Sequence, residues 1–173
     1  ASQAAYDGRR TEDGRFIEGK WKQAGTDFPL NFKEVPVADT RLTLQRRPQT
    51  PEGPFQYEAS DHRIKSNRSP GVELGATLTH PKGDGPYPAV ILISGSGQQD
   101  RDETILGHKS FFVIADHFAK NGIATLRFDD RGKAESTGDP TQCTSEDFAD
   151  DVETLVDWLK HKQVIDSDNI ILV

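Results

Sequence analysis

Residues 88–103 read PAVILISGSGQQDRDE, and they carry the clearest fold signal in the chain. Its apolar run, Ala89–Ile93, lacks the polar alternation of a half-exposed strand, which is typical of a strand buried on both faces in a parallel sheet. Gly95 and Gly97 follow at once, so the backbone can turn sharply where the strand ends. Ligands of open α/β sheets bind outside the carboxyl ends of the strands. The stretch therefore predicts an α/β sheet with a functional loop directly after this strand.

The segments downstream predict alternating helices and strands. Lys109–Asn121 carries apolar residues at helical spacing, and Ile123–Phe128 is patterned as the next strand. A long helix starts at Thr144, with Asp147 placed as its capping-box partner, and Ile170–Val173 begins another buried strand. Crossovers of this kind join parallel neighbours. We therefore expect a mostly parallel sheet with helices on both faces.

The upstream segments are β-patterned. Arg15–Trp21 and Phe28–Val35 alternate around a Gly/Thr/Asp turn, and Phe55–Lys65 and Val72–Thr79 alternate around the turn residues SNRSPG, so each pair predicts a hairpin. The proline-rich residues 47–54 indicate a linker or edge segment. The expected organisation is a β-rich lead-in with its linker over residues 1–54, followed by the amino-terminal portion of an α/β domain over residues 55–173.

Composition excludes several classes of protein. The 173 residues carry a net charge of −7 without the basic patch of a nucleic-acid binder, and no apolar run approaches the length of a membrane span. The single cysteine, Cys143, cannot form an internal disulfide and is expected to be an ordinary loop residue rather than a reactive thiol. The small residues Ala1–Ala5 are typical of a signal-peptide cleavage site and favour export, although a tag remnant or an internal start gives the same pattern.

Charged residues follow both predicted central strands. Asp100–Glu103 form a run of four, which predicts either a paired network around Arg101 that anchors the loop or a direct contact with substrate. For Asp129–Gly132, a loop held by a buried Arg–Asp pair is favoured over a catalytic role. The free N–H groups of Ser94–Gly97 suit an oxyanion, and a plain turn is the alternative.

Three strings together resemble the α/β-hydrolase superfamily: residues 88–103, the segment AKNGIATLRFDDRGKAESTG at 119–138, and DNIILV at 168–173. They are especially similar to bacterial serine esterases whose third strand leads into a GSGPxDRDE loop. The resemblance covers about Val72–Val173, and the hairpin upstream resembles the β-rich lead-in of exported members. It implies a serine carboxylesterase that acts on a small ester through an acyl-enzyme, with no metal or organic cofactor.

Carried onto this chain, the resemblance implies that the backbone N–H of Ser96, with Gly97 beside it, is an oxyanion donor. Ser94 stands where many members have the histidine of an HG pair. The residues of the supporting loops are Gly95, Asp100, Arg101, Asp102, Asp130, Arg131 and Gly132. The family's nucleophile lies in a G-x-S-x-G turn right after the fifth strand, and Ile170–Val173 corresponds to that strand. The resemblance thus implies that the catalytic triad lies in a missing carboxyl-terminal half, present as a continuation or a second chain, and that this chain alone is inactive.

The sequence departs from the family in one loop. Asp130, Arg131 and Gly132 match the DxRG loop, which usually continues GxGxS, whereas residues 132–136 read GKAES. Ala134 therefore replaces a glycine, which puts the local turn in doubt.

The serines and histidines of this chain do not suggest a triad. None of Ser94, Ser96 and Ser136 has a G-x-S-x-G context. His108 and His117 are close in sequence to the oxyanion loop, and His117 is expected on a helix surface. The remaining histidines, expected to face solvent, are His62, His80 and His161.

Two other interpretations stay open. Peptidases, thioesterases, acyltransferases and dienelactone-type hydrolases share the framework, and fold does not fix function. Alternatively the first 50 residues are a binding or docking module beside an inert α/β portion. A strand of the buried type exposed at an edge invites pairing or aggregation, so we also expect the chain to need the missing half for solubility.

Overall fold

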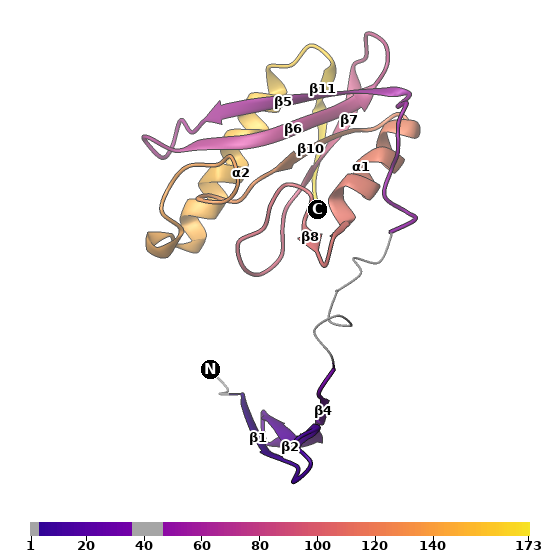
Figure 1. Cartoon of the computed structure of the whole chain (residues 1–173). Coiled ribbons are helices and arrows are strands. Elements are labelled where there is room, and N and C mark those ends of the chain that lie inside the picture. Colours follow the sequence, from indigo (N-terminus) through magenta and orange to yellow (C-terminus); the bar gives the residue numbers. More distant parts are fainter. Residues whose placement is uncertain (1–3, 36–46) are drawn as a thin grey trace. The chain divides into compact units, whose positions relative to one another are not determined.

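The computed structural model describes residues 4–35 and 47–173, which divide into two compact units, Ala1–Thr43 and Leu44–Val173 (Figure 1). Residues 47–54 belong to the second unit, because Arg47 Nη2 donates to the Leu106 carbonyl at 3.3 Å and the Gln49 amide lies 3.4 Å from the His108 ring. Parts of the predicted leader remnant and lead-in, residues 1–3 and 36–46, lie outside the described residues.

The first unit is a small antiparallel sheet. Its central strand β2 (Phe16–Gln23) pairs with β1 (Ala5–Arg10), β3 (Thr26–Pro29) and the short β4 (Phe32–Lys33). The predicted first hairpin is the β2–β3 pair. β1 was not predicted, because its run of polar and glycine residues shows no apolar alternation.

The second unit holds a five-stranded sheet of order β11-β7-β10-β6-β5. Its strands are β5 (Tyr57–Lys65), β6 (Glu73–Pro81), β7 (Tyr87–Leu92), β10 (Ala124–Phe128) and β11 (Ile165–Leu172). The predicted second hairpin is confirmed as β5–β6. In Figure 1 the strands change direction progressively across the sheet from β5 to β11, as expected from the twist of open sheets.

The expectation of a mostly parallel sheet is not confirmed. β7 pairs in parallel with β10 and β11, but β6 pairs antiparallel with both β10 and β5. The turns after β5 and β6 are only a few residues long, and a parallel pair needs a crossover of about a dozen residues or more. Short turns therefore force β5 and β6 to alternate in direction.

Two helices connect the central strands. α1 (Ser110–Lys120) is capped by Asn121. Gly122 follows with a positive φ of 84°, as is common after the C-terminus of a helix. α2 (Ser145–Lys160) begins with the predicted capping box, in which Thr144 and Asp147 exchange side-chain-to-backbone hydrogen bonds. A short ribbon of β8 (Thr104–Ile105) and β9 (His108–Lys109) precedes α1. No helix of the described residues is long and apolar enough to cross a membrane.

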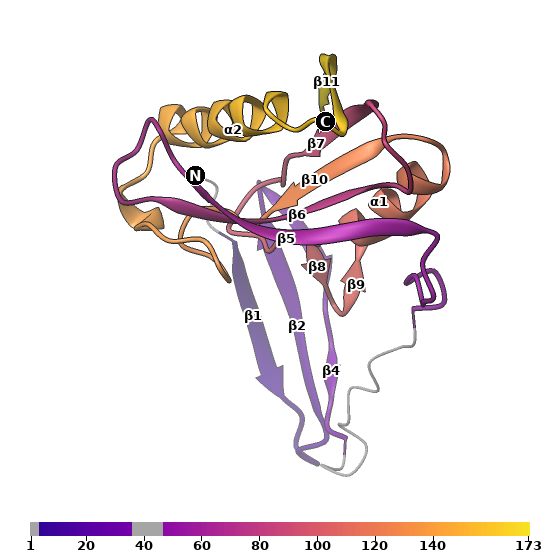
Figure 2. The same cartoon turned by 90° about the horizontal axis from the view of Figure 1, so that it is seen from above.

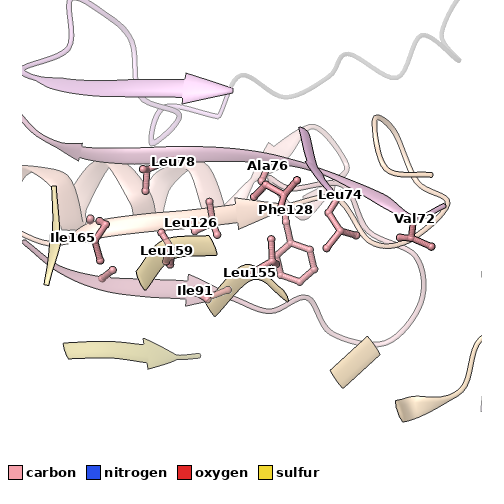
Figure 3. Close-up of a cluster of buried hydrophobic side chains, with 13 residues drawn as sticks. Val72, Leu74, Ala76, Leu78, Ile91, Leu126, Phe128, Leu155, Leu159 and Ile165 are labelled. Atoms are coloured by element: carbon pink, nitrogen blue, oxygen red, sulfur yellow. The ribbon is translucent and has the colours of Figure 1, made fainter. Parts of the chain in front are cut away.

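The core lies between the sheet and α2. Leu126 and Phe128 on β10 join a buried cluster with Leu155 and Leu159 of α2 (Figure 3). Arg127, between them in sequence, points to the other face, where its guanidinium lies 5.1 Å from the Phe112 ring of α1. One helix thus contacts each face near β10, but the described part of the chain has no further α-helix, so helix layers over both faces are not established.

β11 lies at one edge of the sheet, with its end beside the end of β7. Ile171 and Leu172 are 55% and 50% exposed. The Val173 carbonyl accepts a hydrogen bond from Ile93 N at 2.7 Å, so the chain leaves β11 next to the loop that follows β7 (Figure 2).

Candidate functional site

The loop after β7 is fastened to the loop after β10 by Asp130. One oxygen of this carboxylate accepts a hydrogen bond from Ser94 Oγ at 2.7 Å, and the other accepts from Gln99 N at 2.7 Å. Asp130 N donates in turn to the Gln99 carbonyl at 3.1 Å. Both ends of the segment 94–99 are therefore held by one residue that is only 6% exposed.

Ser96 and Gly97 lie between these two anchored ends. Both residues are exposed, and among the hydrogen bonds of the described residues none uses their backbone N–H groups. Gly97 has a φ of 93°, a conformation that favours glycine, so the sequence permits this turn where a side chain would strain it. The backbone N–H groups of residues 94–98, with Ser96 and Gly97 among them, thus have no hydrogen-bond partner in the described protein at the carboxyl end of β7.

A second anchor joins the same two loops through Arg101 and Asp129. The Asp129 carboxylate, 1% exposed, accepts from Arg101 N at 2.7 Å and from Arg101 Nη2 at 2.6 Å. Arg101 Nη2 also pairs with Glu135 at 2.8 Å. Burial lowers the pKa of Arg101, but the hydrogen bonds to Asp129 and Glu135 outweigh it and hold that pKa above its usual value. Asp129 and Glu135, to which the sequence assigned no pairing with Arg101, thus complete the network.

The network around Arg101 does not include its charged neighbours in sequence. Asp100 caps the backbone instead, accepting from the N–H groups of Asp102 and Thr104 at 3.1 and 3.0 Å. Asp102 pairs with Arg127 and, at 3.1 Å, with Lys109. Burial lowers the pKa of Arg127 despite the nearby Asp102 charge. These contacts anchor the loop, and Arg101 itself, with a side chain 14% exposed, is mostly covered.

Arg131 forms the expected buried Arg–Asp pair, but its partner comes from α2. The guanidinium contacts both oxygens of Asp151, with Nε–Oδ2 at 2.9 Å and Nη2–Oδ1 at 2.7 Å. It also reaches Asp147 at 3.2 Å and Ser69 Oγ at 2.9 Å. The pair ties the loop after β10 to the first half of α2, and the sequence analysis missed Asp151.

The turn at Ala134, which the replacement of glycine put in doubt, has a backbone conformation typical of glycine. Ala134 adopts a φ of 45°, a left-handed conformation that ordinarily favours glycine. Gly132 has a φ of 74°, and a Cβ there would lie 2.6 Å from Pro140 Cδ. The backbone of this loop therefore follows a glycine-type path even where alanine replaces glycine.

A cavity of about 490 Å³ opens beside the segment 94–98. Ser94–Gln98 and Asp130 supply its polar side, whereas the rest is mostly apolar side chains of β10 and α2 with their flanking loops. The residues that line the cavity are Ile93, Ser94, Gly95, Ser96, Gly97, Gln98, Phe128, Asp130, Pro140, Ser145, Phe148 and Val152. Its volume is in the range of small-molecule sites.

The serines and histidines of the chain do not form a triad near this cavity. Ser94 Oγ is bonded to Asp130, and Ser136 Oγ is buried between Asp129 O and Gly75 N at 2.7 and 2.9 Å. Among the described side chains, the one Ser–His hydrogen bond joins Ser60 to His62 at 2.8 Å, on the edge strand β5.

The histidines differ in exposure. His117 and His161 are exposed as expected, whereas His62 is half-buried against the Trp158 ring at 4.7 Å. The expectation for His80 was also wrong, because its side chain is 13% exposed and stacks on Tyr87. The described residues hold no group of three or more His, Cys, Asp or Glu side chains arranged for a metal ion.

The sequence model of the X-Pro dipeptidyl-peptidase (S15) family matches residues 70–170, which contain both fastened loops and the strands that carry them. The chain belongs to this family. A curated relative, esterase EstD of Thermotoga maritima, is 40% identical over 111 residues, which cover 64% of this chain and 25% of EstD. The chain thus spans about a quarter of that relative's length.

The fold of this chain is similar to solved structures of α/β hydrolases. The α/β hydrolase GrgF from Penicillium sp. superposes with a TM-score of 0.53 at 26% identity, over 66% of this chain and 36% of GrgF. A hypothetical protein of Pseudomonas aeruginosa superposes with a TM-score of 0.56 at 24% identity, over 72% of this chain and 36% of its own. The α/β-hydrolase resemblance drawn from the sequence is therefore confirmed.

Proposed function

We propose that this protein is a serine esterase in which Ser96, with Gly97 beside it, supplies the backbone N–H that binds the oxyanion. The observation that carries the proposal is a run of unbonded backbone N–H groups, with those of Ser96 and Gly97 near its middle, in a doubly anchored loop at the carboxyl end of β7. Donors fixed in advance at the position where charge develops are the usual means of stabilising such an intermediate. The other donor and the triad lie in residues beyond this chain.

The path of the chain at the end of β11 supports this division. Val173 is hydrogen-bonded through its carbonyl to Ile93 N at 2.7 Å and through its N–H to the Ile91 carbonyl at 3.0 Å. Each further residue advances the backbone by at most about 3.8 Å. A serine in a tight turn directly after β11 therefore emerges beside the segment 94–97, within about 10 Å of Val173.

The chemistry then follows acyl transfer. A serine, deprotonated by histidine, attacks the ester carbonyl, and the carbonyl oxygen becomes an oxyanion held by the two N–H donors. The C–O bond breaks, histidine protonates the leaving alcohol, and water hydrolyses the acyl-enzyme by the same steps. The residues of this chain bind and stabilise the oxyanion, and none of them acts as the nucleophile.

Ester hydrolysis is preferred over peptide hydrolysis because the relative with 40% identity is named an esterase. The apolar lining of the cavity from Phe128, Phe148 and Val152 suits an uncharged acyl or alcohol group. Peptide hydrolysis is the second candidate, since the family is named for X-Pro dipeptidyl-peptidase activity.

The test uses the full-length product of the reading frame. Initial rates are measured with short-chain p-nitrophenyl esters and with X-Pro p-nitroanilides, before and after treatment with a fluorophosphonate probe. We expect ester turnover that the probe abolishes, with the label on a serine beyond Val173. Label on Ser94 or Ser96, or ester turnover that survives complete labelling, would contradict the proposal. Higher kcat/KM for the X-Pro anilides would favour the peptidase instead.

A further inference from the structure

The carboxylate of Asp130 has both of its oxygens committed to one short segment. Oδ1 accepts from Ser94 Oγ and Oδ2 accepts from Gln99 N, each at 2.7 Å. Both partners belong to the loop after β7, and the two contacts lie at its two ends. Asp130 therefore acts on the whole segment 94–99 rather than on one residue of it.

Two further hydrogen bonds close the same segment against the loop after β10. Asp130 N donates to the Gln99 carbonyl at 3.1 Å, and the Gln98 side-chain amide donates to the Arg131 carbonyl at 2.9 Å. Between the anchored Ser94 and Gln98 stand three residues, of which Gly95 and Gly97 are glycines. Glycine has the widest choice of backbone conformations, so this span depends on its anchors for a single shape.

Asp130 is itself held firmly, because each of its neighbours is in a buried ion pair. Asp129 pairs with Arg101 at 2.6 Å, and Arg131 pairs with Asp151 at 2.7 Å. Asp129, Asp130 and Arg131 are consecutive in the chain. The two ion pairs therefore hold the backbone on both sides of Asp130. The segment 94–99 is thus anchored to a loop that two buried ion pairs tie to neighbouring elements.

We propose that Asp130 and Ser94 form a latch that sets the direction of the Ser96 and Gly97 N–H groups, and that both are positioning residues which do not touch substrate. The inference rests on the proposed function and names how its oxyanion donors are held. It also gives a role to Ser94, whose hydroxyl makes a contact that fixes the start of the loop.

The latch predicts a specific kinetic pattern in the full-length protein. Asp130→Asn keeps the side-chain volume but leaves an amide that cannot accept from Ser94 and Gln99 together. Loss of a whole oxyanion donor costs about 10²–10³-fold in kcat, so partial misdirection should cost about 10–100-fold, with KM changed less than about threefold. Ser94→Ala should show a smaller loss of the same kind, and Ser94→Thr, which retains the hydroxyl, should restore most of it.

Two measurements separate positioning from mere folding. Amide hydrogen exchange in the peptide covering residues 93–101 should accelerate in Asp130→Asn and Ser94→Ala, while exchange in β7 and α2 stays unchanged. Affinity for a trifluoromethyl ketone, which forms a tetrahedral adduct, should fall with kcat. Asp84→Asn is the matched control, because Asp84 is an exposed carboxylate in the turn before β7, at the opposite end of the strand.

The outcomes distinguish the two proposals. If the wild-type protein hydrolyses no ester or peptide and takes no fluorophosphonate label, the proposed function is wrong, and faster exchange in residues 93–101 would then report the latch alone. If the wild type is active and Asp130→Asn retains its kcat, inhibitor affinity and slow exchange, the latch is wrong. A rise in KM with kcat unchanged would assign Asp130 to substrate binding and also overturn the inference.

Discussion

Replacing Asp151 by alanine removes the carboxylate that pairs with Arg131 in the interior of the second unit. Asp151 is 1% exposed and Arg131 5% exposed, and the two share hydrogen bonds of 2.9 and 2.7 Å. The guanidinium that remains keeps Asp147 at 3.2 Å and Ser69 at 2.9 Å but loses its best-aligned partner. The variant therefore leaves a buried charge only partly compensated.

The magnitude follows from that geometry. Removing one partner of a buried ion pair costs about 3–5 kcal/mol, and the contacts left to Arg131 place this variant at the lower end, about 3 kcal/mol. Replacing both partners at once, as Arg131→Met with Asp151→Leu, removes the orphaned charge. The double variant should therefore be more stable than Asp151→Ala alone.

Urea-induced unfolding of the full-length protein at neutral pH measures the difference. The control is Asp157→Ala on the same helix, because Asp157 is 41% exposed and pairs with Arg68 at 3.2 Å. An exposed pair contributes less than about 1 kcal/mol. Equal losses for the Asp151 and Asp157 variants, or a double variant less stable than Asp151→Ala, would refute the buried-pair reasoning.

Three further changes test other parts of the structure by urea unfolding. Gly75→Ala should cost about 1–3 kcal/mol, because its Cβ would lie 2.7 Å from Arg101 Nη2; an unchanged midpoint would contradict this. Ala134→Gly should stabilise by about 1 kcal/mol, since Ala134 has a φ of 45°, and a loss would show that alanine is unstrained there. Burial and the nearby Asp116 charge raise the pKa of Tyr57 from 10.0 to about 12. The stability that the protonated Tyr57 hydroxyl contributes is therefore complete below pH 10 and should disappear between pH 10 and 12. Tyr57→Phe should lack that part of the pH dependence, and identical profiles would contradict the shift.

The elements of the second unit were predictable because their signals are local. Ala89–Ile93 is apolar throughout, and Thr144 with Asp147 is a start signal contained within four residues. The antiparallel pairing of β6 with β10 was not foreseen, since parallel or antiparallel pairing depends on which strands become neighbours. β6 lies beside β10, more than 40 residues away in sequence, and no local pattern specifies that pairing.

The two anchored loops were predicted, but most of their contacts were not. The sequence identified Arg101 and Arg131 as anchors, yet their acids, Asp129 and Asp151, come from other elements. One signal was available: Asp147, Asp151 and Leu155 recur at a spacing of four, so Asp151 lies on the apolar side of α2, where an acid needs a partner. For Asp129 no spacing pattern indicates a pairing with Arg101, because the direction of its carboxylate is set by the loop backbone.

The most direct test of the central claim is a crystal structure of the full-length protein with a phosphonate bound covalently to its nucleophile. The phosphoryl oxygen stands where the oxyanion forms during ester hydrolysis. The account predicts this oxygen at about 3 Å from the backbone nitrogen of Ser96 or Gly97, with Ser94 still bonded to Asp130. A phosphoryl oxygen that contacts neither nitrogen, in an enzyme that hydrolyses esters, would contradict the claim that this loop is the oxyanion site.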